Sequence, residues 1–149
     1  MSIQRIATTM RRRAEAFARM KEYDDESLVT MCSTVSHSLA IVLKRAGFVA
    51  WMVGGTFDGT GHFWVEVAQP TLTVVDITAT QFDDFDERAP RVLITRYTDA
   101  PWGPMYTPKL RARGDVRRAI QVCDLDDVQE FERRTRTWLD RCACATRAA

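Results

Sequence analysis

The hydrophobic pattern of this chain changes its period at Gly47, and that change sets the class of fold. Before Gly47, apolar residues recur at the three- and four-residue spacing of amphipathic helices. After Gly47, β-branched and aromatic residues alternate with polar ones, as in half-buried strands. Glycine is also a common helix stop, because it adopts the left-handed conformation without strain. We therefore expect an α+β domain in which N-terminal helices pack on an antiparallel β-meander.

Two helices are predicted before this point, over residues 3–22 and about 28–46, with the acidic residues 24–26 between them. The apolar stripe of the first helix is Ile3, Ile6, Met10, Phe17 and Met20. That of the second is Val35, Leu39, Val42, Leu43 and Ala46. The basic side chains mostly opposite the first stripe are Arg11, Arg12, Arg13 and Arg19. The run 11–13 is predicted to form a solvated helix face, with a nucleic-acid patch as the weaker alternative.

Four strands are predicted after Gly47, over residues 48–57, 62–67, 72–77 and 91–95, with a turn at 58–61. Three prolines and a glycine between 99 and 108 predict a loop. A last helix over about 124–142 has as its buried candidates Leu125, Val128, Phe131 and Leu139. The chain has no internal repeat and no linker, so residues 1–149 are predicted to form one domain. Its core covers about 28–97, and its C-terminal helical extension covers about 115–145.

The charge balance excludes several classes of partner. Lysine and arginine total 21 against 20 acidic residues, so no strong basic field attracts nucleic acid. No apolar run approaches the roughly 20 residues that span a bilayer, and no signal peptide is evident. We expect a cytoplasmic protein that binds neither nucleic acid nor membrane, with export by a signal-independent route and the oligomeric state both left open.

The four cysteines are predicted to be reduced thiols, because no export signal accompanies them. The pair Cys142 and Cys144 lacks the further ligands that structural zinc needs, so exposed thiols are preferred there to a metal site. The sequence predicts no metal and no cofactor. Because the chain has only two histidines, chemistry that depends on histidine must use His37 or His62.

A strand register brings one of these histidines to a carboxylate. Alternation along the predicted strand 62–67 places His62, Trp64 and Glu66 on one face, and the apolar residues between them form the predicted core face. A three-residue connection over 68–70 then puts His62 directly opposite Asp76. Opposed residues have Cβ atoms about 5 Å apart, which suits an imidazole–carboxylate hydrogen bond.

A nucleophile is available at the start of the second predicted helix. Cys32 follows a possible N-cap at Thr30, where the helix dipole and a nearby imidazolium would favour its thiolate. With His62 as base and Asp76 as orienter, Cys32 completes a catalytic set. His37 lies about 140° around the same helix from Cys32, so it is predicted to be structural or solvent-facing.

The order and spacing of these motifs resemble the transglutaminase-like, papain-related superfamily. The resemblance rests on Cys32 with the helix behind it, on residues 53–55, on Gly61-His62-Phe63-Trp64-Val65-Glu66-Val67, and on residues 75–78. It covers roughly residues 30–80 and implies a papain-like core with Cys32, His62 and Asp76 as the triad. It also implies a protein or peptide substrate, and the chain is similar in size to small bacterial peptidases of this group. The chain departs from the pattern at two points, because no Trp follows Cys32 and no Gln precedes it.

Two further residues are candidate substrate contacts. Trp64 shares the face of His62, and Gln81 follows the third predicted strand; packing and structural roles are the alternatives. The acidic residues at 83–87 are predicted to be a solvated loop, and the apolar segment 102–106 to be a lid or a partner contact.

The leading hypothesis is therefore a cysteine hydrolase or acyl transferase acting on amide bonds. Taken singly, Cys32 would be a small core residue, His62 a hydrogen-bonded strand residue, and Asp76 the cap of a turn with Thr78. The alternative function is a catalytically silent binding module that contacts a protein through the 101–108 loop or the C-terminal helix.

Overall fold

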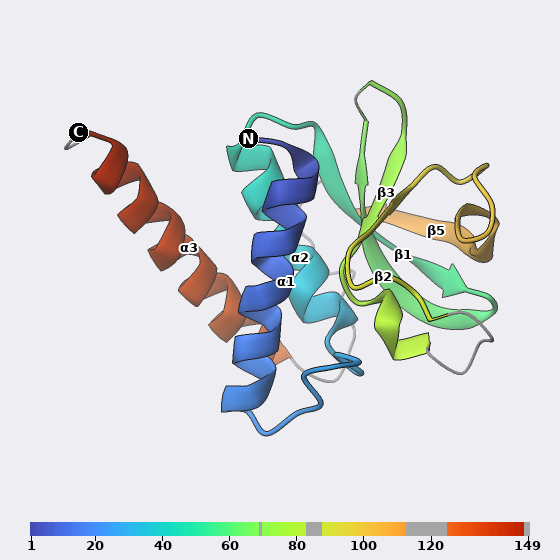
Figure 1. The fold of residues 1–149 in the computed structure, drawn as a ribbon, viewed down its shortest axis with the longest axis horizontal. Coiled ribbons are helices and arrows are strands. Elements are labelled where there is room, and N and C mark those ends of the chain that lie inside the picture. Colours follow the sequence, from blue (N-terminus) through green and yellow to red (C-terminus); the bar gives the residue numbers. More distant parts are fainter. Residues whose placement is uncertain (69, 83–87, 113–124, 148–149) are drawn as a thin grey trace.

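The computed structural model describes residues 1–68, 70–82, 88–112 and 125–147, and it has the predicted α+β architecture. The helices are α1 (Ile3–Met20), α2 (Cys32–Arg45) and α3 (Leu125–Arg147). The strands are β1 (Ala50–Phe57), β2 (Thr60–Val67), β3 (Thr73–Asp76), β4 (Leu93–Thr95) and β5 (Tyr106–Ala112). Two 3₁₀ turns are η1 (Ala79–Phe82) and η2 (Gly103–Met105). Figure 1 shows α1 and α2 beside the sheet and α3 slanting past them, with its C-terminal end directed away from the sheet.

The sheet is antiparallel throughout, in the order β4-β3-β2-β1-β5. The predicted four-stranded meander is therefore confirmed. The fifth strand was predicted as loop as far as residue 108, because Pro101, Pro104 and Pro108 argue against strand structure. β5 tolerates Pro108 because it is an edge strand. Its pairing with β1 is also irregular there, since the register shifts between Gly54 and Gly55 of β1.

The second helix begins later than predicted, at Cys32 instead of about residue 28. Leu28 and Thr30 have φ angles of 53° and 70°, which belong to the left-handed region and do not continue a helix. The N-cap is Met31 and not Thr30. The helix stop at Gly47 is confirmed, since its φ is 95° and its N–H donates to the carbonyl of Lys44.

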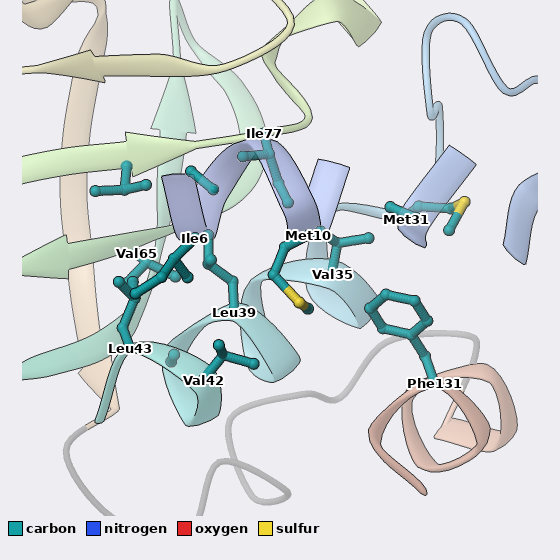
Figure 2. Close-up of a cluster of buried hydrophobic side chains, with 14 of the residues drawn as sticks. Ile6, Met10, Met31, Val35, Leu39, Val42, Leu43, Val65, Ile77 and Phe131 are labelled. Carbon is teal, nitrogen blue, oxygen red and sulfur yellow. The ribbon is translucent and has the colours of Figure 1, made fainter. Parts of the chain in front are cut away.

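The main core lies between the helices and the sheet, as Figure 2 shows for side chains from α1, α2, α3, β2 and the end of β3. Most of the predicted stripe residues are buried there, including Met10, Leu39 and Phe131. Three predicted core residues are exposed instead, because each lies at or beyond the end of its helix: Met20, Ala46 and Leu125. Arg11, predicted on the solvated face, is only 2% exposed.

The opposite face of the sheet is also buried, whereas one core face was predicted. Trp51, Phe57, Trp64 and Tyr106 form a second core there, with residues of the 97–105 segment packed against it. The predicted lid or partner loop, 102–106, is thus part of this cover. Both sets of alternating side chains on β2 therefore lie in apolar surroundings, and polar groups on either face need internal partners.

Gly55 lies where β1 closely approaches the edge strand β5, and its replacement is expected to destabilise the fold. A Cβ at this position would lie 2.1 Å from the carbonyl oxygen of Thr107 and 2.8 Å from Cη2 of Trp64. Gly55→Ala should therefore reduce the free energy of unfolding by about 1–3 kcal/mol or more, measured by urea denaturation. Gly61→Ala is the matched control, since nothing lies within 4 Å of its added Cβ. Equal urea midpoints for the two variants would contradict the close approach.

Candidate active site

Cys32 is the first residue of α2, and its side chain is partly accessible to solvent. Its neighbour Met31 is buried in the helix-side core, which fixes the start of the helix. The N-cap makes no side-chain hydrogen bond, so backbone N–H groups of the first turn lack that partner. Cys32 therefore combines an accessible thiol with the positive end of a helix dipole.

His62 and Asp76 form a buried pair on adjacent strands. Nε2 of His62 lies 2.7 Å from Oδ2 of Asp76, and both side chains are fully buried. The predicted contact is present, but the predicted register is wrong by two residues, since Val67 pairs with Thr73. A shift of two leaves every side chain on its original face, because alternation has a period of two. Asp76 therefore reaches His62 diagonally.

Asp76 accepts hydrogen bonds from three residues. Besides His62, the hydroxyl of Tyr106 donates to Oδ2 at 2.7 Å, and the N–H of Thr78 donates to Oδ1 at 2.8 Å. The Thr78 hydroxyl adds a bond to Oδ1 at 3.1 Å, so Asp76 both orients His62 and caps the turn after β3. An ionised carboxylate can only accept, so Nε2 of His62 carries the proton and Nδ1 is the basic nitrogen.

The pair perturbs the pKa of both members. Burial alone would lower the pKa of His62, but the charge and hydrogen bond of Asp76, with a smaller contribution from Cys32, raise it to about 9. Burial would raise the pKa of Asp76, but His62, Tyr106 and Thr78 hold it below its usual value. The ion pair His62⁺–Asp76⁻ is thus favoured at neutral pH.

Gln81 reaches the other side of the imidazole. Its carboxamide lies 2.7 Å from Nδ1 of His62, and the turn η1 that carries it begins three residues after Asp76. A carboxamide can donate to a neutral Nδ1 or accept from a protonated one, so Gln81 can meet both states of the ring. The structure therefore brings together four of the five predicted site residues in one polar cluster, namely Cys32, His62, Asp76 and Gln81.

Trp64 is placed differently from the predicted cleft wall. Its side chain is fully buried, and its ring stacks beside His62 at a centroid distance of 6.0 Å. Its Nε1–H donates to the hydroxyl of Tyr97, which in turn donates to Oε1 of the buried Glu66. Arg111 completes the charge balance by donating to both Glu66 oxygens. Trp64 thus supports the imidazole from inside the fold and offers no surface to a substrate.

The remaining candidate residues lie elsewhere. His37 lies 2.7 Å from Glu132 of α3, so it joins two helices as a structural residue. Cys142 and Cys144 are exposed on α3. The acidic residues at 83–87 and Cys123 lie outside the described residues. In the part of the chain that the structure describes, no group of three His, Cys, Asp or Glu side chains is placed to hold a metal ion.

Two contributors to the site were not predicted, Tyr106 and the Glu66 network. Tyr106 lies 30 residues after Asp76 in a segment predicted as loop, and nothing local connects the two. Glu66 gave a usable signal, because its alternation with His62 and Trp64 predicted a shared face. A carboxylate on a face that proves to be buried requires donors.

A scan against protein families, a search of curated proteins and a search of solved structures each found no match for this chain. Across the described residues, no helix has both the length and the hydropathy needed to cross a membrane.

Proposed function

We propose that this protein is a cysteine-dependent enzyme that acts on amide bonds of a protein or peptide substrate. The observation that carries the proposal is the buried His62–Asp76 pair, with Cys32 close enough to contribute to the raised pKa of the imidazole. A buried histidine held by a carboxylate and facing an accessible thiol at a helix N-terminus is the arrangement that activates a cysteine nucleophile. The sequence resemblance to transglutaminase-like proteins supports the same assignment and a papain-like core.

The residues suggest a consistent reaction sequence. The Cys32 thiolate attacks the carbonyl carbon of the substrate amide, and N–H groups of the first turn of α2 stabilise the developing oxyanion. The C–N bond then breaks as His62 gives the proton on Nδ1 to the leaving nitrogen, which leaves a thioester on Cys32. Water or a substrate amine attacks the thioester, giving hydrolysis, deamidation or acyl transfer according to the amide and the acceptor.

Selective alkylation of Cys32 tests this proposal. At pH 6 ordinary thiols, with a pKa of about 8.5, are almost entirely protonated and react slowly. With the imidazolium of His62 beside it, Cys32 should react with iodoacetamide at pH 6 at least about tenfold faster than Cys142 and Cys144, measured by peptide mass spectrometry. Equal, slow labelling of all the cysteines would instead favour the catalytically silent binding module.

A further inference from the structure

Arg11 is a buried cation in the middle of α1, and it does not belong to the proposed triad. Its guanidinium donates from Nε to Oε1 of Glu15 at 2.7 Å, within the same helix. From Nη1 it donates to the carbonyl of Ile77 at 2.7 Å and to the hydroxyl of Thr80 at 2.8 Å. From Nη2 it donates to the carbonyl of Glu26. Burial of a guanidinium is costly without such partners, so these bonds fix the two segments outside α1 that supply them.

Those segments are the ones that carry the proposed site. Ile77 directly follows Asp76, and Thr80 directly precedes Gln81, which contacts His62. Glu26 lies in the turn between α1 and α2 that ends at Cys32. The Thr80 hydroxyl also donates to the carbonyl of Ser27 at 3.0 Å, so the two segments are joined directly beside the guanidinium.

The charge of Arg11 is balanced by a carboxylate that serves two arginines. Burial would raise the pKa of Glu15, but hydrogen bonds from Arg11 and Arg91 lower it below its usual value. Glu15 is therefore ionised at neutral pH and holds the guanidinium in one orientation. Arg91 comes from the segment before β4, so the same carboxylate also ties that segment to α1.

We propose that Arg11 is a positioning residue for the Cys32–His62–Asp76 triad. It holds the turn that ends at Cys32 and the segment between Asp76 and Gln81 in one fixed relation, so that thiol and imidazole remain aligned. This inference rests on the proposed function and assigns Arg11 no contact with the reacting atoms. Lysine cannot replace Arg11, because the three nitrogens of the guanidinium donate to separate partners and a single ammonium nitrogen cannot reach them all.

The test compares Arg11→Lys with Arg12→Lys, since Arg12 is exposed on the same helix. For each full-length variant, the rate of Cys32 alkylation by iodoacetamide is measured from pH 5 to pH 9, beside circular dichroism and thermal unfolding. Arg11→Lys should remain folded, yet lose about tenfold or more of the rate at pH 6, because small misalignments of reacting groups are costly. Its rate should then rise only at higher pH, as for an ordinary thiol. Arg12→Lys should keep the wild-type profile.

A folded Arg11→Lys variant with the wild-type pH profile, even one with a lower melting temperature, would show a purely structural role and overturn the inference. Should Arg11→Lys not fold, Thr80→Val removes the hydroxyl shared by Arg11 and Ser27 at similar volume, and the same readout decides. Slow labelling of Cys32 in the wild type would refute the proposed function itself, which is a separate outcome from any difference between variants.

Discussion

Cys32→Ala is expected to abolish the reaction with amide substrates, with a loss of at least about 10⁴-fold in rate. The alanine cannot form the thioester. No described cysteine can substitute, since Cys142 and Cys144 follow Asp140 of α3, which pairs with Arg45 at the opposite end of α2 from Cys32. The measurement is covalent labelling of the purified protein by a fluorescent peptidyl acyloxymethyl ketone. A thiolate bonds to the methylene carbon of this probe and displaces its acyloxy group as a carboxylate. Labelling should be complete in the wild type and absent in the variant.

Two comparisons keep this prediction interpretable. Cys142→Ala should label as the wild type does, because Cys142 lies on α3 and not at the start of α2, where the proposed nucleophile is. The Cys32→Ala protein should retain its circular dichroism spectrum, because the lost side chain is only partly buried. Undiminished labelling of folded Cys32→Ala would exclude Cys32 as the nucleophile.

Asp76→Asn is expected to preserve the fold while lowering the rate by about 10⁴-fold, by analogy with other histidine-orienting carboxylates. A carboxamide next to Nε2 can donate to it, which favours the tautomer with the proton on Nδ1. Nδ1 then cannot accept a proton from Cys32. The measurement is the labelling rate with the same ketone probe, and a rate within tenfold of the wild type would remove Asp76 from the mechanism. His37→Ala is the control, since His37 contacts Glu132 and should leave the labelling rate unchanged.

Asp76→Asn should also change how the free energy of unfolding depends on pH. His62 has a folded-state pKa of about 9 against 6.5 for the free side chain, so its contribution is fully present below about pH 6.5. That contribution is lost as the pH rises toward 9. The free energy of unfolding should therefore fall over this range in the wild-type protein. The fall should be much smaller once Asp76→Asn is added.

Asp76→Ala extends the test to the whole cluster. It removes the acceptor of His62, Tyr106 and Thr78 together, and breaking a buried pair in this way costs about 3–5 kcal/mol of unfolding free energy. Tyr106→Phe removes one of these donors and should cost about 1.5–3 kcal/mol, the contribution of a hydrogen bond to a charged group.

Much of the candidate site could be predicted because the face on which a side chain lies does not change when a strand register is wrong by two residues. The connection between β2 and β3 is longer than expected, yet a two-residue shift leaves Asp76 on the face of His62. Gln81 was predicted as a substrate contact, whereas the structure places its carboxamide against Nδ1 of His62. The start of α2 could not be predicted, since leucine and threonine rarely adopt the left-handed backbone conformation that Leu28 and Thr30 have here.

The α+β class, the order of the three helices and first four strands, and the three residues of the proposed triad follow from the sequence alone. Each of these depends on local periodicity and on spacing within about 50 residues. Only the tertiary structure decided the burial of Arg11 and the bond from Tyr106 to Asp76. It also decided that Trp64 supports the imidazole from within. The physical reason is that these features arise where distant segments meet, as when Arg11 contacts a carbonyl 66 residues away, and no local pattern records such an encounter.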